Sequence, residues 1–506
     1  MVAEARHLEV ASPNPALYCV VEYEKNELIT REAKIDPQAV RIVPREHLHG
    51  AGAGAGAAPP ADPSARPAGD AVLVYPVWDH DATFDVVRSE AEVTVTIWDR
   101  SASTRGEGDA FVGMMKIKSP HVPGKQHNNW FRLLPRQYHE SVRGDIRIKL
   151  MYRTTTHKAL KPEDFELLKV LGQGNFGKVM QVRKTDTGRL YAMKVLRKKN
   201  IVEQQQIAHT LSERNVLIQA NCPFLVGLKF SFQTVEKLYL VLDYMNGGEL
   251  FFHLQQGPFS EGRAKFYTAE LVLALQHLHK YNIVYRDLKP ENILLDSNGH
   301  VALTDFGLCK EVGWNEQTNT FCGTAEYLAP EVLTGQGYGK PVDWWSLGIL
   351  FYEMTTGLPP FFSENVHVMH KKILHGELVF PPGFTPAAEM LVRQLLTRDP
   401  DRRLASGPRD AEDVKSHPFF MDVDWDRLAR RQLRPPFKPD VRSEADTSNF
   451  DPQFTSTVPM DSLPNNSVPL SSTIQDNFKG FTYTDDTDIG NVRASLSTSA
   501  TGSLRR

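Results

Sequence analysis

Alternation of hydrophobic and polar residues marks the N-terminal part of the chain. In residues 93–97 and 146–150, apolar side chains occupy every second position. A period of two is typical of antiparallel strands with one buried face. Similar strand-like runs occur at 18–23, 71–75 and 113–117. We therefore predict an all-β sandwich over residues 1–155.

A different order of elements begins at Phe165. Short strand-like runs come first, and the long stretches 263–281 and 342–355 that follow are helical in character. Strands followed by helices predict an α+β protein with a small sheet lobe and a larger helical lobe. The strand-like runs lie at 179–183, 191–196 and 238–243.

Two further segments lack the composition of a folded core. Residues 51–69 consist almost entirely of Ala, Gly and Pro, which predicts a flexible insertion in the sandwich because so little apolar surface cannot offset the entropy of ordering. After Phe420 the chain is rich in Pro, Ser, Thr and Asp. This favours an extended tail over 421–490, which docks on a folded domain, and a disordered end at 491–506.

Composition narrows the function classes. The chain has 506 residues, of which 41% are hydrophobic and 24% charged, and its net charge is -3. This balance excludes nucleic-acid binding by bulk charge, and we expect no nucleic-acid partner. The four cysteines lack CxxC spacing, no apolar run reaches the ~20 residues of a spanning helix, and the start lacks a secretory pattern. These features predict an intracellular, multidomain protein.

A glycine-rich segment, LGQGNFGKV, spans residues 171–179. Gly172, Gly174 and Gly177 fit the spacing G-x-G-x-x-G-x-V, in which a turn between two strands brings backbone N–H groups against phosphates. The motif alone leaves an ordinary glycine-rich turn open as an alternative. A dinucleotide-binding turn would need a helix directly after the glycines, and strand-like residues follow them here.

A lysine and a glutamate follow at a suggestive spacing. Lys194 lies in an apolar strand-like run, and Glu213 lies 19 residues later in an amphipathic helical stretch. An ion pair between them would hold the lysine against ATP phosphates. A solvated lysine is the alternative.

Three motifs then occur in a fixed order. Residues 285–292 read YRDLKPEN, residues 305–307 read DFG and residues 329–331 read APE. Any one tripeptide occurs by chance, but all of them in this order and spacing indicate phosphoryl transfer.

Each polar group in these motifs has a task in that reaction. Asp287 would accept or orient the proton of the substrate hydroxyl, and Lys289 would neutralise the transferred phosphoryl group. Asn292 and Asp305 would ligate Mg²⁺. Phosphoryl transfer relies on positioning and charge neutralisation, which explains the mixture of carboxylates, an amide and lysines.

These motifs resemble a eukaryotic protein kinase over residues 165–420. Two kinds of feature are similar to the AGC group. Tyr285 stands in place of the usual His, and the other similar segments are 320–324, 435–439 and 478–483. Within it the chain resembles protein kinase B and the TOR-dependent ribosomal-protein kinase. The preceding sandwich resembles that of the fungal nutrient-signalling kinase with a C2 domain. The resemblance implies a serine/threonine protein kinase that uses ATP and Mg²⁺ and acts on arginine-rich sites in nutrient and growth signalling.

The resemblance implies further site residues. Glu249, Glu291 and Glu353 match positions that hold substrate arginines, although solvated or internally paired glutamates remain an alternative. Thr324 would brace Asp287 and line the substrate channel. Nucleotide contacts are implied for Leu171, Gly172, Gly174, Gly177, Val179, Lys194, Leu242, Asp243, Met245, Glu249 and Phe450.

Three phosphorylation sites are also implied. Thr320 would be modified by an upstream kinase, and its phosphate would meet Arg286, Lys310 and His209. Thr482 would be modified by a TOR-type kinase. It lies in FKGFTY, whose aromatic residues Phe478, Phe481 and Tyr483 we expect to dock in a groove of the small lobe. Thr457 is a third site, although the usual Thr-Pro is replaced by Thr-Val-Pro.

The sandwich departs from a calcium-binding C2 domain. Such domains place several carboxylates in facing loops. Here Asp99 and Asp109 remain, but Ser101 stands where a second Asp is usual. The sequence favours a structural or partner-docking sandwich that lacks its first strand, with peripheral lipid contact as the alternative. The resemblance to a C2 domain rests on residues 98–99, 109–113, 130–133 and 144–146.

Several alternatives stay open from the sequence. A pseudokinase scaffold and a lipid-binding adaptor with secondary kinase activity are the competing functions. Cys309 and Cys322 flank the activation segment and could pair on oxidation, although unpaired thiols are the commoner outcome. We expect a cytoplasmic location, with partial nuclear or peripheral membrane association left open.

Overall fold

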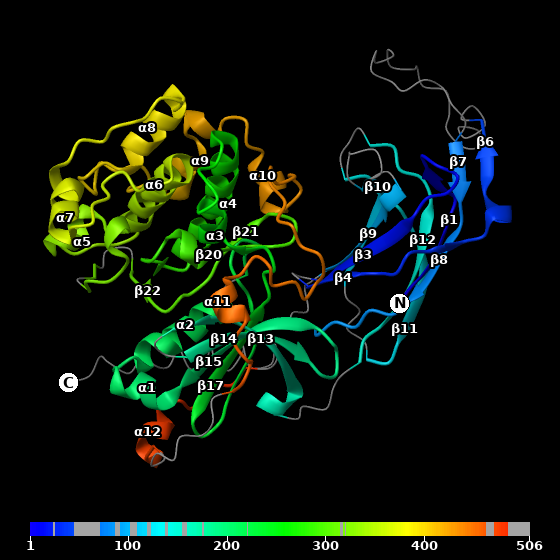
Figure 1. Ribbon diagram of the computed structural model, residues 1–506, viewed down its shortest axis with the longest axis horizontal. Coiled ribbons are helices and arrows are strands. Elements are labelled where there is room, and N and C mark those ends of the chain that lie inside the picture. Colours follow the sequence, from blue (N-terminus) through cyan, green and yellow to red (C-terminus); the bar gives the residue numbers. More distant parts are fainter. Residues whose placement is uncertain are drawn as a thin grey trace. The chain divides into compact units, whose positions relative to one another are not determined.

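The computed structural model divides into two compact units, Met1–Lys158 and Ala159–Thr484 (Figure 1). The predicted insertion at 51–69 and the predicted disordered end at 491–506 lie outside the described residues. The predicted fold class, a β-sandwich followed by a two-lobed α+β unit and a tail, is confirmed. The structure describes residues 1–23, 26–44, 71–86, 92–101, 109–118, 123–136, 140–153, 159–174, 177–219, 221–313, 317–318, 320–461 and 470–483.

The first unit is built from antiparallel strands. Among the described residues they form three sheets, ordered β11-β12-β1-β8-β5, β10-β9-β3-β4 and β2-β7-β6. Val95 of β9 pairs with Val21 on one side and Met115 on the other, and all three are buried. Alternate positions of neighbouring strands therefore line one core. The strands are β1 (Val2–Arg6), β2 (Leu8–Val10), β3 (Leu17–Tyr23), β4 (Asn26–Ile29), β5 (Lys34–Ile35), β6 (Arg41–Val43), β7 (Ala71–Val74), β8 (Pro76–His80), β9 (Glu92–Asp99), β10 (Ala110–Lys118), β11 (Gln126–Arg132) and β12 (Asp145–Met151).

Strand β1 corrects the expectation that this unit lacks its first strand. It lies between β12 and β8 in the five-stranded sheet, with Ala5 opposite Ile146. Val2 and Ala5 are almost completely buried. Only one residue of its sequence VAEAR is β-branched, so its local preference for a strand is weak. The two neighbouring strands decide its conformation.

The small lobe of the second unit is a five-stranded antiparallel sheet of order β13-β14-β15-β17-β16, with helices α1 and α2. The predicted strand-like runs lie in β14, β15 and β17. Every residue of β17 is buried, as in a strand covered on both faces. The elements are β13 (Phe165–Gln173), β14 (Gly177–Lys184), β15 (Leu190–Arg197), α1 (Lys198–Glu203), α2 (Ile207–Gln219), β16 (Leu228–Gln233) and β17 (Lys237–Asp243).

The larger lobe is mainly helical and is organised around α4 and α6. Ser260 caps α4 by accepting the backbone N–H of Arg263 at 3.3 Å. Helix α6 ends at Gly357, whose φ of 87° suits glycine. Most of α6 is buried, including Trp344 and Trp345, so it is the central helix of the lobe. The elements are β18 (Gly248–Glu249), α3 (Leu250–Leu254), α4 (Glu261–Lys280), β19 (Ile283–Val284), β20 (Ile293–Leu295), β21 (Val301–Leu303), β22 (Lys310–Glu311), α5 (Pro330–Thr334), α6 (Pro341–Thr356), α7 (Val366–His375), α8 (Pro386–Leu395), α9 (Ala411–Lys415) and α10 (Trp425–Ala429).

The tail returns to the small lobe. It contains the short helices α11 (Pro452–Thr455) and α12 (Ser472–Asp476), and Figure 1 shows α12 beside α1. Gln475 of α12 accepts a hydrogen bond from Lys198 Nζ at 2.8 Å. Tyr483 and Ser231 exchange two backbone hydrogen bonds of 2.8 and 2.9 Å. The end of the tail thus pairs with β16, the edge strand of the sheet.

Among the described residues, no helix combines the length and apolar character that crossing a bilayer requires.

Candidate active site

Strand β15 and helix α2 bring the predicted lysine and glutamate together. Lys194 Nζ lies 2.7 Å from Glu213 Oε1 and 3.2 Å from Asp305 Oδ1. Burial opposes the charge on Lys194, but Asp305 and Glu213 outweigh it and hold the pKa of the ammonium above its usual value. The charge of Lys194 in turn holds the pKa of Asp305 below its usual value. The site therefore presents a fixed cation between two carboxylates.

A second cluster surrounds Asp287 in the larger lobe. Its Oδ1 accepts the hydroxyl of Thr324 at 3.0 Å, and its Oδ2 accepts the amide of Asn292 at 2.8 Å. Lys289 Nζ lies 3.0 Å from Asp287 Oδ2 and also donates to Thr324 Oγ1 at 3.0 Å. These contacts leave the carboxylate of Asp287 a single well-defined orientation. The predicted bracing contact of Thr324 is present.

The three glycines of the glycine-rich segment lie at the end of β13, directly after it and at the start of β14. A Cβ on Gly177 would lie 1.7 Å from the carbonyl oxygen of Val195, so the packing of β14 on β15 requires glycine there. A Cβ on Gly172 or Gly174 would meet nothing within 4 Å. The protein itself therefore does not require glycine at these two positions, and open backbone is what a phosphate group needs. Leu171 of β13 is buried and Val179 of β14 is partly buried.

The end of β17 and the residues directly after it, 242–246, are called the hinge and include three residues with an implied nucleotide contact. Leu242, Asp243 and Met245 are all buried. Asp243 Oδ2 accepts the backbone N–H of Gly227 at 2.9 Å, and Lys229 Nζ lies 3.3 Å from Asp243 Oδ1. The side chain of Asp243 is thus held by protein groups, so its backbone is what remains for the implied nucleotide contact.

The tail covers the hinge. Phe450 is buried and stacks on Tyr244 with ring centroids 6.0 Å apart. The hydroxyl of Tyr244 donates to the carbonyl of Asp446 at 2.6 Å, and the side-chain amide of Asn449 donates to the carbonyl of Asn246 at 3.2 Å. This segment brings Phe450 beside Tyr244, next to other residues with an implied nucleotide contact.

The glutamates predicted to bind arginine form an acidic group, and two of them have carboxyl pKa values above the usual range. Burial and the nearby charges of Glu291 and Asp451 raise the pKa of Glu249 to about 7. Burial and the charges of Glu291 and Glu326 raise the pKa of Glu353 to about 8. Glu291 itself is exposed. Mutual repulsion of this kind is relieved when a cation binds.

The residues present fit a nucleotide with a divalent cation. Asn292 uses its amide N–H to hold Asp287, so the oxygen of that amide remains for a metal ion. The side chain of Asp305 is about half exposed. Among the described residues, no group of three or more His, Cys, Asp or Glu could hold a metal by itself. A pair of oxygen ligands completed by substrate phosphates is how proteins commonly hold Mg²⁺.

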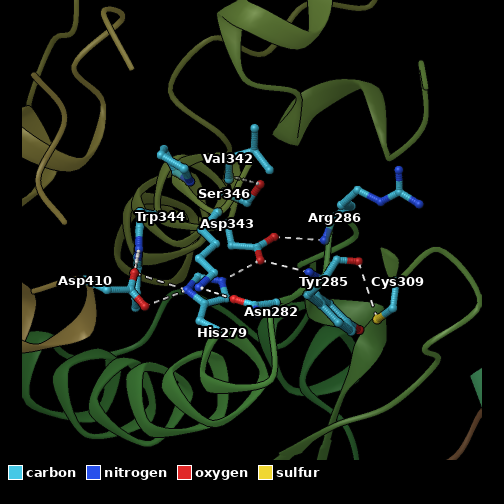
Figure 2. Close-up of polar contacts among 12 residues, drawn as sticks. His279, Asn282, Tyr285, Arg286, Cys309, Val342, Asp343, Trp344, Ser346 and Asp410 are labelled. Atoms are coloured by element: carbon cyan, nitrogen blue, oxygen red, sulfur yellow. Dashed lines mark hydrogen bonds and ion pairs between the residues drawn. The ribbon is translucent and has the colours of Figure 1, made fainter. Parts of the chain in front are cut away.

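Three residues that the sequence analysis missed lie beneath the catalytic loop, and two of them, His279 and Asp343, are almost completely buried (Figure 2). Asp343 of α6 accepts the backbone N–H groups of Tyr285 and Arg286 at 2.9 and 2.8 Å. Its Oδ2 also contacts His279 of α4, which in turn contacts Asp410. An acid among the apolar residues at the start of α6 carries a detectable signal, because a buried charge requires partners.

The activation segment places Thr320 with its side chain exposed. Its hydroxyl lies 3.3 Å from Thr318 Oγ1, which accepts Lys310 Nζ at 2.8 Å. Tyr338 donates to the carbonyl of Thr320 at 2.5 Å and accepts Arg286 Nη1 at 3.3 Å. Two of the predicted cations are therefore linked to Thr320 through one other residue. Lys310 is linked through Thr318, and Arg286 is linked through Tyr338.

The third predicted cation and the two cysteines have other contacts. His209 contacts the side chain of Gln206. Cys309 Sγ lies 3.8 Å from the carbonyl oxygen of Tyr285, and Cys322 Sγ lies 3.6 Å from the hydroxyl of Tyr338. Both thiols are free, and burial raises the pKa of Cys309. A buried thiol with a raised pKa is a poor nucleophile.

The acids of the first unit are held by protein groups. Asp99 Oδ1 accepts the backbone N–H groups of Ala16 and Ser101, each at 3.0 Å, and the hydroxyl of Ser101 at 2.7 Å. Asp109 Oδ2 accepts the hydroxyl of Tyr18 at 2.6 Å. Ser101 thus orients Asp99 instead of adding a second carboxylate.

Comparisons with known proteins agree with this geometry. The protein kinase domain matches residues 165–420, the protein kinase C terminal domain matches residues 441–483 and the C2 domain matches residues 72–133. The chain is 50% identical over 442 residues to the serine/threonine-protein kinase gad8 of Schizosaccharomyces pombe, which covers 86% of this chain and 76% of gad8.

Two other relatives are longer. The serine/threonine-protein kinase SCH9 of Candida albicans is 51% identical over 429 residues, covering 82% of this chain and 54% of SCH9. The serine/threonine-protein kinase YPK2/YKR2 of Saccharomyces cerevisiae is 56% identical over 378 residues, covering 74% of this chain and 54% of the relative. The chain thus spans about half the length of these two proteins. With the kinase domain matched over half of its residues, the chain belongs to the protein kinase family, as an AGC-group serine/threonine kinase with an N-terminal C2 domain.

Proposed function

We propose that this chain transfers the γ-phosphate of ATP, in the presence of Mg²⁺, to serine or threonine in arginine-rich segments of proteins that serve nutrient and growth signalling. The observation that carries the proposal is the joint placement of two clusters, Lys194 with Glu213 and Asp305, and Asp287 with its three partners. A pseudokinase scaffold does not transfer phosphate, so it would not need all the polar side chains of both clusters. No observation favours a pseudokinase.

The residues act by positioning and charge. Asp287 accepts or orients the proton of the substrate hydroxyl, and Thr324 and Asn292 fix its carboxylate. Lys289 neutralises charge on the transferred group, and Lys194 anchors the phosphates with Glu213 behind it. Asn292 and Asp305 would hold the metal ion. When bound, that ion supplies neutralisation of phosphate charge.

Arginine recognition is the first testable part of the function. Glu249 and Glu353 are half-buried carboxylates whose raised pKa values reflect burial and repulsion. A guanidinium can bond both oxygens of a carboxylate. On a peptide array with MgATP and the full chain, we expect preference for Arg-x-Arg-x-x-Ser/Thr. Preference for proline after the target residue, or for acidic flanks, would refute the proposal.

The same glutamates give a pH dependence. Glu249 has a pKa of about 7 and Glu353 of about 8, so both ionise as the pH rises through this range. Since only the ionised form pairs with arginine, KM for an arginine-containing peptide should fall between about pH 6 and 8. A matched peptide with alanine for arginine should show a much flatter KM. Equal pH profiles for the two peptides would exclude this role.

Phosphorylation of Thr320 by an upstream kinase is proposed as the first activating step. The phosphate would meet Lys310 and Arg286 through the contacts described above. We expect Thr320→Ala to lower kcat by about tenfold or more, because a hydrogen bond to a charged group contributes ~1.5–3 kcal/mol. The melting temperature should not change, since the Thr320 side chain is exposed. Full activity of this variant in a peptide assay would show that the segment orders without phosphate.

The remaining proposals concern regulation and location. Thr482 and Thr457 are proposed as tail sites, with a TOR-type kinase acting at the tail; the side chains of both are exposed. The C2 domain is proposed to dock a protein partner, with peripheral lipid contact as its alternative role. We propose a cytoplasmic location, with nuclear or peripheral membrane fractions.

A further inference from the structure

The four-stranded sheet of the first unit, β10-β9-β3-β4, has one face in the core and one face outside it (Figure 1). In β9, Val95 and Ile97 belong to the core, whereas Thr94, Thr96 and Trp98 alternate with them and are partly exposed. Successive side chains of a strand point to opposite faces of the sheet. The outer face is therefore a surface made by alternate residues of four neighbouring strands.

Mostly apolar residues run across the middle of this outer face. One residue from each strand contributes, and adjacent members are paired in the order Met114, Thr96, Val20 and Ile29. Leu134 extends the line beyond β10, because it exchanges two backbone hydrogen bonds of 2.7 and 3.0 Å with Met114. These five residues are called the apolar row. Both ends of the row are exposed, Leu134 at 52% and Ile29 at 47%.

The polar atoms beside the apolar row are bonded within the chain. Thr96 Oγ1 accepts the indole N–H of Trp98 at 2.9 Å and donates to the carbonyl of Val20 at 3.5 Å. The guanidinium of Arg136 lies 4.0 Å from the ring centroid of Phe111 and 5.1 Å from that of Trp98. Since these groups already have partners, a partner molecule could cover the apolar row without leaving them unsatisfied.

A row of polar residues runs parallel to the apolar row and carries opposite charges at its two ends. Adjacent members are paired in the order Lys116 of β10, Thr94 of β9, Glu22 of β3 and Glu27 of β4. Lys116 is exposed, and the two glutamates are partly exposed. These four residues are called the charged row. The outer face is therefore basic at its β10 edge and acidic at its β3–β4 edge.

This distribution makes the face complementary to itself. A two-fold axis parallel to the strands turns a second copy over and reverses the order of its strands, while each row stays opposite the same row of the other copy. Lys116 of one copy then faces Glu27 of the second copy, and Leu134 faces Ile29. An interface in which two identical chains use the same patch is the usual form of a homodimer.

We propose that the outer face of the sheet β10-β9-β3-β4 docks a second copy of this chain, with the apolar rows in contact and each basic edge on an acidic edge. The proposal rests on the docking role given above to the C2 domain, and it is independent of the kinase reaction. Burial of the two exposed ends, Leu134 and Ile29, supplies attraction. The charged rows fix the orientation and disfavour other partners.

The character of the face also indicates the strength of the contact and disfavours a membrane. Four short strands offer a small area, and small interfaces are weak and reversible. We therefore expect a dissociation constant in the micromolar range or above. A membrane surface fits less well, because Glu22 and Glu27 on the face would meet anionic lipid headgroups.

Sedimentation equilibrium of the full chain measures this association directly. Concentrations from about 1 to 200 µM cover the expected range of dissociation constants. The wild type should convert from monomer to dimer and go no further, because an isologous interface closes on itself. A chain that stays monomeric throughout would overturn the second copy as the occupant. It would leave the docking role of the C2 domain to a different protein or to the second unit of the same chain.

Charge reversal tests the orientation. Lys116→Glu makes the charged row acidic at both ends, and the double change Glu22→Lys/Glu27→Lys makes it basic at both ends. Each variant alone should bind itself at least about tenfold more weakly than the wild type, because like charges then face each other. An equimolar mixture of the two variants should dimerise about as well as the wild type, since an acidic row then meets a basic one.

Two further variants complete the test. Lys34→Glu is the matched control for charge, because Lys34 is exposed on β5 of the other sheet, and it should leave the dissociation constant unchanged. Ile29→Asp should prevent dimerisation, and melting temperatures check that every variant folds. If the wild type dimerises but the charge variants dimerise equally well alone, or their mixture stays monomeric, the contact lies elsewhere and the proposed face is wrong.

Discussion

Replacing Asp287 with asparagine is expected to lower kcat for a peptide substrate by about 10²- to 10⁴-fold, the usual contribution of a positioned acid–base group. Asparagine has nearly the same size, so it fits the space among Thr324, Lys289 and Asn292. It cannot accept the proton, and it removes the charge that Lys289 contacts at 3.0 Å. The loss should therefore appear in kcat more than in KM for ATP.

The control for this prediction is Asp422→Asn. Asp422 pairs with Lys265 at the surface of the same lobe, and its side chain is largely exposed. Its replacement should leave kcat within about twofold, because surface pairs contribute little. Steady-state phosphorylation of one arginine peptide by each variant makes the comparison, and unfolding curves confirm that both fold. An Asp287→Asn enzyme with wild-type turnover would refute the proposed mechanism.

The second large effect is expected in the tail. Phe478 and Phe481 are completely buried, and Tyr483 is 2% exposed. Ser231 donates its hydroxyl to the carbonyl of Phe481 at 2.6 Å, and Gln233 donates to the carbonyl of Phe478 at 2.8 Å. Burying a phenylalanine is worth about 3–5 kcal/mol against alanine in a core. A Phe478→Ala/Phe481→Ala double variant should therefore release the end of the tail.

Release should lower activity because the tail supports α2. The guanidinium of Arg214, the residue after Glu213, lies 6.0 Å from the ring centroid of Phe481. Undocking removes this contact, and the Lys194–Glu213 pair loses its support. We expect kcat to fall by at least about tenfold. A rise of about 1.4 kcal/mol in the activation free energy is enough for that factor.

The tail experiment separates docking from phosphorylation. Thr482 is exposed between two buried aromatic residues, so Thr482→Ala removes the phosphate site without disturbing the groove, and Thr482→Glu should keep part of the activity. Lys479→Ala is the matched control, since Lys479 is exposed in the same segment. All variants are compared with Thr320 phosphorylated. If the double variant phosphorylated peptide as fast as the wild type, the tail would have a different role.

Local patterns were sufficient for part of the fold. Alternation predicted β9 and β12, and further strand-like runs predicted β3, β7 and β10, because neighbouring side chains of a strand point in opposite directions. Helices α4 and α6 were predicted within two residues at each end, since their apolar residues recur at helical spacing. Strand β1 was missed because its residues have no strong preference and only β12 and β8 hold it.

The kinase motifs were readable because their chemistry needs fixed residue types at short spacings. Gly172, Gly174, Lys194, Asp287 and Asp305 each belong to a motif in which the predicted reaction favours that residue type. The aromatic residues of the tail also signalled docking, because such a cluster cannot stay exposed in a polar segment at low cost.

The support beneath the catalytic loop was decided by tertiary structure alone. His279, Asp343 and Asp410 are separated by 64 and 67 residues in the sequence, and His279 and Asp410 look ordinary in their own segments. Their meaning depends on burial, which brings one imidazole within 3.0 Å of two carboxylates. The sequence alone predicted the groups that we assign to the reaction, because chemistry selects residue types. Only the packing of α4 against α6 and α9 selected the groups that hold them in place, because charge strength and hydrogen-bond partners depend on burial and distance.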